Sequence, residues 1–329
     1  MAHEPKTLQQ AIVFFDDPNN CLDFLAIRRW PEGVICPTCA SKKVRFLATR
    51  RVWECRAKHA KKQFSIKVGS IFEDSAIGLD KWLTAIWMIA NCKNGVSSYE
   101  IHRALGVTQK SAWFMLHRIR VALRAGSFEK FGGGENSEVE IDETFIGGKV
   151  KNMHSRKRNR LVRETGNNNI SSDLKTIVMG FLDREQRKVR ATIVPNTSRI
   201  TLQAEVLKHV ADDSNVYTDD AVAYRNLPET YVHEVVNHVQ QYVRGRVHTN
   251  GLENFWSLLK RGLNGTYVAV EPFHLSRYLD EQVFRFNNRG TRENPCTDAD
   301  RFDLAVRNLV GRRLTYKELT GKEGETAAF

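Results

Sequence analysis

The segment Val139–Gly148 (V-E-I-D-E-T-F-I-G-G) alternates apolar and polar residues with a period of two and ends at a pair of glycines. This pattern predicts a half-buried β-strand. Asp142 lies near the centre of the segment, where an isolated carboxylate would lose much of its hydration. A carboxylate held on a rigid strand therefore predicts a partner, which is either an opposite charge or a bound cation.

Two later segments carry acidic residues that could join Asp142. The segment Asn215–Asp220 (N-V-Y-T-D-D) reads as a short strand that ends in two aspartates, and His248–Gly262 (H-T-N-G-L-E-N-F-W-S-L-L-K-R-G) reads as a helix that carries Glu253. The helix has an apolar stripe at i, i+3, i+4 and i+7, formed by Leu252, Phe255, Trp256 and Leu259. Glu253 adjoins this stripe and can reach the sheet, unless it is an ordinary solvated glutamate. Lys260 and Arg261 continue outward toward a phosphate backbone.

Three carboxylates on separate elements fit a site for hard divalent cations. Oxygen ligands are the ones such cations prefer, and two ions about 3.5–4 Å apart can promote an in-line phosphoryl displacement. We predict that Asp142, Asp219 and Glu253 hold two hard divalent cations, with Asp142 as the bridging ligand. Spacing alone does not decide between neighbours, so Asp220 remains an alternative to Asp219, and Glu140 or Glu143 remains an alternative to Asp142.

Composition points to a multidomain protein with a polyanionic partner. The chain has 329 residues, of which 41% are hydrophobic, and it carries a formal net charge of +12. This length predicts two or three domains. Three segments, Cys36–Lys67, His102–Arg124 and Lys149–Arg163, together carry a net charge of +21, so the remainder is negative by nine. Charge concentrated in this way favours contact with nucleic-acid phosphates.

The sequence also argues against membrane and secreted classes. No apolar run approaches the roughly 20 residues needed to span a bilayer, and the N-terminus lacks a basic segment followed by an apolar one. We expect a cytoplasmic protein with no membrane partner, associated with the nucleoid when it is bound to DNA. Six cysteines are too few and too clustered for a disulfide scaffold, so in a reducing compartment they indicate a metal site or simple burial.

Four residues have the spacing of a zinc ribbon. Cys36-Pro-Thr-Cys39 forms a C-x2-C knuckle, and Cys55 and His59 follow after a short hairpin pattern. Soft ligands in two such pairs match a structural, tetrahedral Zn²⁺ site. The second pair is less specific, because Cys55 could simply be buried and His59 could be a basic surface residue.

A helix-turn-helix pattern follows the ribbon. Ser97-Ser-Tyr-Glu100 predicts a capping box that opens a helix to Leu105, and a Gly106 turn leads into a second helix over Gln109–Leu123. The second helix of such a motif enters the major groove of DNA. Its predicted DNA contacts are Gln109, Lys110, Trp113 and Arg118.

The remaining chain predicts an α/β domain. After a glycine-rich stretch come three strands, a helix, a strand, a short helix, a strand and a longer helix, which is the layout of an RNase H-like fold with a mixed five-stranded sheet. We therefore predict N-terminal helices and the zinc ribbon in residues 1–75, the helix-turn-helix domain in 76–126, a linker in 127–136, the catalytic domain in 137–290, and a C-terminal helical segment and tail in 291–329. A basic excursion between the first two strands is predicted to contact DNA through Lys149, Lys151, Arg156, Lys157, Arg158 and Arg160.

These motifs together resemble the bacterial insertion-sequence transposases of the DDE superfamily that place a zinc ribbon and a helix-turn-helix before an RNase H-like domain. The resemblance rests on C-P-T-C, Q-F-S-I-K-V-G-S-I-F-E-D-S, I-D-E-T-F-I-G-G, Y-T-D-D-A-V-A-Y and the Glu253 helix, and it spans about Cys36–Gly262. One departure is the C-x3-H pair, where C-x2-C is the more usual form.

The resemblance implies a function. Asp142, Asp219 and Glu253 would be the catalytic triad, with magnesium as the working metal. The substrates would be inverted-repeat DNA at the transposon ends and a target DNA, and two paired ends imply at least a homodimer on DNA. Two other classes share parts of the pattern: a metal-dependent, site-specific nuclease without strand transfer, and a DNA-binding regulator with an inactive catalytic domain.

Overall fold

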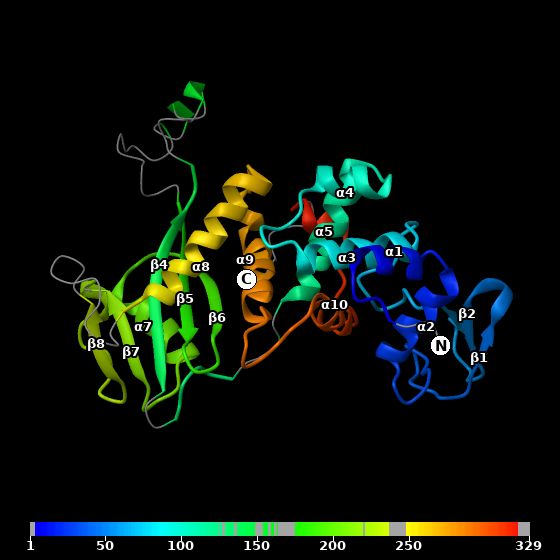
Figure 1. Cartoon of the computed structure of the whole chain (residues 1–329), viewed down its shortest axis with the longest axis horizontal. Coiled ribbons are helices and arrows are strands. Elements are labelled where there is room, and N and C mark those ends of the chain that lie inside the picture. The colour runs from blue at the N-terminus through cyan, green and yellow to red at the C-terminus, as the bar shows by residue number, and fades with distance from the viewer. Residues whose placement is uncertain are drawn as a thin grey trace. The chain divides into compact units, whose positions relative to one another are not determined.

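The computed structural model describes residues 4–124, 126, 129–134, 137–148, 154–156, 159–160, 163, 175–219, 221–236 and 248–321. The chain divides into two compact units, which are drawn in Figure 1. One unit is formed by Met1–Ala125 together with Asn288–Phe329, and the other is formed by Gly126–Asn287. Within the described residues, none of the helices is both long enough and apolar enough to cross a bilayer.

The first unit begins with helices and a small antiparallel sheet. The sheet has the order β1 (Val44–Leu47), β2 (Val52–Cys55) and β3 (Gln63–Phe64), and a 3-10 turn (Ala48–Arg50) joins the first two strands. Such a small sheet needs packing beyond its own hydrogen bonds. Trp53 supplies that packing, because its ring stacks on Phe64 and meets Trp30 edge to face at a centroid distance of 5.2 Å.

The helices of the first unit come from both ends of the chain. They are α1 (Leu8–Phe15), α2 (Pro18–Arg29), α3 (Leu79–Asn91), α4 (Ser98–Leu105), α5 (Gln109–Leu123), α10 (Asp298–Arg307) and α11 (Tyr316–Leu319). Phe302 of α10 is buried against Phe15, Phe24 and Trp87. The sequence predicted only a C-terminal helical segment and tail in residues 291–329, and in the structure α10 of this segment completes the aromatic core.

The turn between α4 and α5 follows its sequence pattern. The predicted capping box is confirmed: the Ser97 side chain accepts from the Glu100 backbone and the Glu100 side chain accepts from the Ser97 backbone. Gly106 ends α4 with a φ of 61°, in the left-handed region that glycine adopts without steric cost. The Thr108 side chain then caps α5.

The second unit is built on a five-stranded sheet, as the sequence predicted. Its strands are β4 (Glu138–Ile146), β5 (Thr176–Asp183), β6 (Lys188–Val194), β7 (Asn215–Asp219) and β8 (Val232–Val236). They lie in the order β6-β5-β4-β7-β8, so β4, which carries Asp142, is central. The β4–β5 and β5–β6 pairs are antiparallel, and the β4–β7 and β7–β8 pairs are parallel, so the sheet is mixed.

Helices cover both faces of this sheet. Alternate residues of a strand face opposite sides, and Val139 and Ile141 pack with Leu202 and Val206 of α7 (Arg199–His209) on one face. On the other face lie α8 (Asn250–Arg261) and α9 (Leu275–Asn287) (Figure 1). Their apolar side chains form a second buried cluster with those of β5 and β6. Short turns lie at Val222–Tyr224, Gly262–Tyr267 and Pro272–His274, the second of which is a π-helical continuation of α8.

Candidate metal centres and nucleic-acid interface

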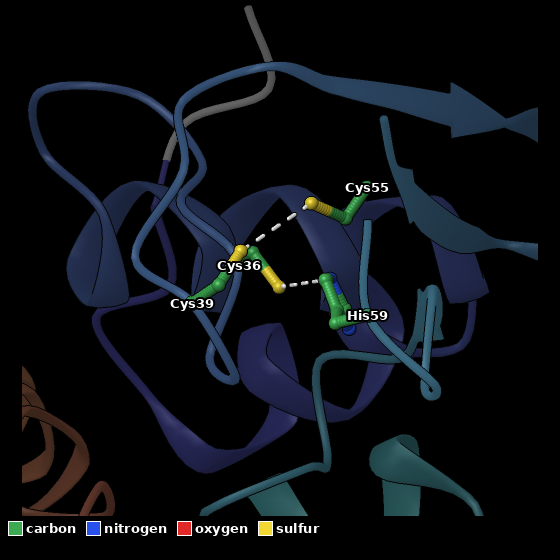
Figure 2. Close-up of side chains that lie close together, drawn as sticks. All are labelled: Cys36, Cys39, Cys55 and His59. Atoms are coloured by element: carbon green, nitrogen blue, oxygen red, sulfur yellow. Dashed lines mark hydrogen bonds between the residues drawn. The ribbon is translucent and has the colours of Figure 1, made fainter. Parts of the chain in front are cut away.

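The four predicted zinc ligands lie together in the ribbon. One ligand atom from each of Cys36, Cys39, Cys55 and His59 lies within 4.8 Å of the other three. Two of these contacts, drawn as dashed lines in Figure 2, join Cys36 Sγ to His59 Nε2 and Cys39 Sγ to Cys55 Sγ. They measure 3.5 Å and 3.6 Å. Metal–ligand lengths of about 2.3 Å to sulfur and about 2.0 Å to nitrogen place tetrahedral ligands about 3.5–3.8 Å apart. The set therefore fits a structural Zn²⁺ ion.

The local fold explains how these ligands meet. The C-x2-C knuckle is closed by a bond from the Ala40 N–H to the Cys36 carbonyl, with Ala40 in the left-handed region. Cys55 is the last residue of β2, and its N–H donates to the Lys62 carbonyl across the hairpin. His59 lies inside this loop, and so the C-x3-H pair brings a nitrogen to the cluster in place of a fourth sulfur.

The first two predicted acids lie on neighbouring parallel strands. The β4–β7 ladder ends at the pair Glu140 and Tyr217. Continuing that register by two residues brings Asp142 level with Asp219, the last residue of β7. The Asp219 side chain also accepts from the Ala221 N–H, which turns the chain away from the sheet at this point. Asp142 and Asp219 are therefore neighbours across the two strands, at the point where β7 ends and β4 continues.

Asp142 is held by donors from two elements. Its Oδ2 accepts from the Trp256 indole of α8 at 2.9 Å, and its Oδ1 accepts from the Glu143 backbone. Burial raises the pKa of Asp142 to about 6, and the charges of Asp219 and Glu253 act in the same direction, while the two N–H donors oppose it. Trp256 was predicted only as a core residue, and its indole N–H is a contact that the apolar stripe did not reveal.

Glu143 is a fourth carboxyl group and lies near Asp142 and Asp219. Its Oε1 atom is buried and has no hydrogen-bond partner within the described part of the chain. Burial raises its pKa to about 8, with further contributions from the charges of Asp219 and Asp142. A buried, unsatisfied carboxyl among other acids is costly unless a proton or a cation compensates it. This donor set fits a divalent cation by its chemistry.

The carboxylates of Asp142, Asp219 and Glu253 are close enough for their charges to interact, but they do not form a coordination cluster. Over the described residues, the only group of three or more Cys, His, Asp or Glu ligand atoms lying within 4.8 Å of one another is the ribbon set. Glu253 is exposed at the start of α8, and its N–H bonds to the Thr249 carbonyl. Asp220 lies outside the described residues.

The alternative in which Glu140 replaces Asp142 does not hold. The Glu140 side chain is only 2% exposed, and its Oε1 accepts from Arg184 Nε at 2.8 Å. Its Oε2 accepts from the Leu252 N–H at 3.0 Å. The carboxylate is thus already compensated inside the protein. Neither this ion pair nor the part of Arg184 in it was predicted.

One predicted DNA contact on α5 must be corrected. Arg118 is buried, with 4% of its surface exposed. Its guanidinium donates to the carbonyls of Ile71, Glu73 and Leu314. Arg118 therefore links three segments inside the first unit, and its buried guanidinium is not accessible to DNA. Trp113 is half-buried against the His117 ring, so its role is also partly internal.

The other predicted contacts on helices α5 and α8 are more accessible. Lys110 is exposed, and its Nζ lies 4.7 Å from the centroid of the Tyr316 ring. Gln109 is half-buried and donates its amide to Ser98. On α8, Lys260 and Arg261 are exposed in the last turn.

The predicted basic excursion is described only in part. Arg156 and Arg160 are exposed. Lys149, Lys151, Lys157 and Arg158 lie outside the described residues.

We call Asp142, Glu143, Asp219 and Glu253 the acid site. The raised pKa values of Asp142 and Glu143 predict how the stability of the fold depends on pH. The folded-state pKa values of Asp142 and Glu143, about 6 and about 8, lie above their ordinary values of 3.8 and 4.5. Folding therefore favours the protonated forms, so this contribution is full below pH about 4 and is lost as pH rises through about 6 and then about 8. We expect the unfolding temperature in buffer free of divalent ions to fall by roughly 5 °C or more between pH 5 and pH 8.5.

The variant Glu143→Gln separates the contribution of Glu143 to this pH dependence from the contributions of other titrating groups. Calorimetric scans across the same pH range should show a smaller fall for the variant than for the wild type. Mg²⁺ added at pH 8.5 should stabilise the wild type. Equal pH profiles for the two proteins would show that the Glu143 carboxyl is not strained by its burial.

Comparison with known proteins places this geometry in a family. Residues 133–287 match the model of the ISXO2-like transposase domain, and residues 17–60 match that of the transposase zinc-ribbon domain. The ribbon and the sheet unit thus define the class, a transposase with an N-terminal zinc ribbon. The chain belongs to the insertion-sequence transposases that have an ISXO2-like transposase domain.

Two relatives support this assignment. The chain is 34% identical over 102 residues to an uncharacterized transposase-like protein of Haemophilus influenzae, a match that covers 31% of this chain and 82% of that protein. It is 28% identical over 272 residues to an uncharacterized protein in transposable element ISH50 of Halobacterium salinarum, covering 80% of this chain and 89% of the other. A solved simian T-cell lymphotropic virus intasome in complex with the PP2A regulatory subunit B56 gamma covers 65% of this chain with 14% identity, but a TM-score of 0.30 supports no conclusion.

Proposed function

We propose that this transposase cuts DNA at the inverted-repeat ends of its element and joins the freed 3′-hydroxyls to a target by metal-dependent phosphoryl transfer. In this proposal the Gly126–Asn287 unit has an RNase H-like fold, and Asp142, Asp219 and Glu253 are its catalytic acids. The observation that carries the proposal is that Asp142, Glu143 and Asp219 are neighbours where β4 and β7 adjoin, so that burial and the charge of Asp219 raise the pKa values of Asp142 and Glu143. Glu253, at the start of α8, contributes to the shift of Asp142.

The acid site has the donors for Mg²⁺ or Mn²⁺. Asp142, Asp219 and Glu253 would hold two such ions, and Glu143, with its unsatisfied oxygen, lies beside them. When bound, the two ions would activate the attacking oxygen and stabilise the leaving oxygen of an in-line displacement. The protein's part is to orient these carboxylates, and the Trp256 indole does this for Asp142 while it opposes the rise in pKa that burial causes.

DNA binding would use several basic surfaces. The α4–α5 pair would act as a helix-turn-helix with Lys110 facing DNA, and Lys260 and Arg261 would meet the backbone beside the acid site. The exposed Arg156 and Arg160 belong to a further basic segment. Phosphate contacts of this kind position the duplex and make binding salt-dependent. Joining two ends requires two active sites, so the working form would be at least a homodimer.

The direct test is an assay of joined products. Purified protein is incubated with labelled inverted-repeat duplex, an unlabelled target plasmid and Mg²⁺, and the label is followed on denaturing gels. We expect label covalently joined to the plasmid, and no joining when Ca²⁺ replaces Mg²⁺. Cleavage without joining would identify a site-specific nuclease, and binding without cleavage would identify a regulator; either result would overturn the proposal.

A further inference from the structure

The first turn of α8 is capped by another element of the sheet unit. Thr249, at its N-cap, makes no side-chain capping bond. Free N–H groups at a helix start need an acceptor, and Glu140 of β4 supplies it by accepting from the Leu252 N–H at 3.0 Å. The negative charge also suits the positive end of the helix. The strand that carries Asp142 therefore holds the helix that carries Glu253.

Gly251 is what allows this approach. A Cβ atom on Gly251 would lie 2.8 Å from Glu140 Oε2 and 2.9 Å from Leu182 Cδ1. Real Cβ atoms do not come that close, so any other residue would push the helix or the carboxylate away. Glycine is thus favoured at position 251 of H-T-N-G-L-E-N for a steric reason, which the sequence pattern alone did not reveal.

Arg184 ties the same carboxylate to the residues before α8. Its Nε donates to Glu140 at 2.8 Å, and its Nη2 donates to the His248 carbonyl at 2.6 Å. Arg184 also pairs with Glu138 and lies over the Tyr217 ring. A buried ion pair contributes little net stability because of its desolvation cost, and its better attested effect is to select one geometry.

A second attachment lies one turn further along α8. Trp256 donates to Asp142, and its ring lies over Gly180 of β5, where a Cβ would come within 2.6 Å of Trp256 Cζ2. Glu253 is placed between the two attached residues, Leu252 and Trp256. Two attachments about one helical turn apart restrain both the rotation and the sliding of a helix on a strand.

We propose that Glu140, together with Arg184 and Gly251, is a positioning device that sets where Glu253 stands relative to Asp142. This inference rests on the proposed catalytic role of those two acids. Glu140 itself is enclosed by protein groups and does not touch the substrate. A displacement of about 1 Å in a catalytic group can cost about 10²-fold in rate, so loosening the first turn of α8 should slow chemistry with little effect on end binding.

The test compares Glu140→Leu and Gly251→Ala with Val206→Ala, a core change on the opposite face of the sheet. Three quantities are measured on the full chain: the single-turnover cleavage rate at saturating end DNA, the Kd for end DNA, and hydrogen exchange at the Leu252 amide. We expect both site variants to lose about 10²-fold in rate at unchanged Kd, and Glu140→Leu to expose the amide to faster exchange. Glu140→Gln, which keeps an acceptor for Leu252, should recover part of the rate.

Gly251→Ala separates positioning from loss of the Glu140 charge, because it keeps that carboxylate and displaces the first turn of α8. Alanine favours helix more than glycine does, so helix propensity alone predicts normal or better behaviour for this variant, and only the displacement predicts a lower rate. Rates equal to that of Val206→Ala in both site variants would overturn the positioning role. Glu253→Gln distinguishes failure of the positioning role from failure of the proposed catalytic function. If this variant cleaves at the wild-type rate, the proposed catalytic function itself is wrong, whatever the Glu140 variants do.

Discussion

Asp142→Asn is expected to lower the rate of end cleavage by at least about 10³-fold, which corresponds to several kcal/mol of transition-state stabilisation. The asparagine keeps an oxygen to accept from the Trp256 indole, so the fold should remain. What is lost is the negative charge with which Asp142 would hold a divalent cation. Because burial raises the pKa of the native carboxyl to about 6, the neutral variant should also be at least as stable as the wild type at pH 8 without divalent ions.

Asp212→Asn is the matched control, since Asp212 is an exposed acid of the same unit outside the acid site. Cleavage of labelled end duplex and thermal unfolding are measured for the three proteins in parallel. The control should cleave as the wild type does, and all three should bind end DNA equally. Near-normal cleavage by Asp142→Asn would remove this carboxylate from the chemistry.

Loss of the ribbon zinc is the second change with a large expected effect. Binding of a structural Zn²⁺ contributes on the order of 10 kcal/mol to the folding of small zinc domains, and the ribbon has only a three-stranded sheet and a small aromatic cluster besides. We expect Cys55→Ser to lose its zinc, to unfold locally around β1 to β3, and to lose binding to end DNA. The Gly126–Asn287 unit should keep its own unfolding transition.

Zinc content is measured by elemental analysis, and DNA binding is measured by gel shift. Cys296→Ser is the control, because Cys296 is half-buried in the same unit and is not among the four ligands. The control should hold one zinc per chain and bind as the wild type does. A Cys55→Ser protein that retains a full equivalent of zinc would exclude the assigned ligand set.

Local patterns were sufficient where the decisive contacts are local. The C-x2-C and C-x3-H spacing predicted the zinc set, and the period of two over Val139–Ile146 predicted the strand that the structure extends by one residue to Glu138. The mixed five-stranded sheet also followed from the order of the elements. These features depend on ligand spacing and side-chain periodicity, which a sequence displays directly.

Partners from distant segments could not be predicted in this way. Arg118 has the spacing of an accessible helix residue, but its acceptors lie 45 to 196 positions away in the chain, and together they draw it into the interior. Glu140 was an alternative cation ligand by position, and only the approach of Arg184 and α8 shows that its charge is already used. In both cases the sequence suggested a binding role for the charge, DNA contact for Arg118 and cation binding for Glu140, and long-range packing gives each charge a partner inside the protein.

The most direct measurement for the proposed chemistry is a structure of the protein bound to end DNA with Mn²⁺, in which anomalous scattering locates the ions. We predict two Mn²⁺ sites, with oxygens of Asp142, Asp219 and Glu253 at about 2.0–2.2 Å from the metal and the DNA backbone beside them. If the ions lie elsewhere, or if these three carboxylates stay beyond coordination distance in the DNA complex, the proposed active site is wrong.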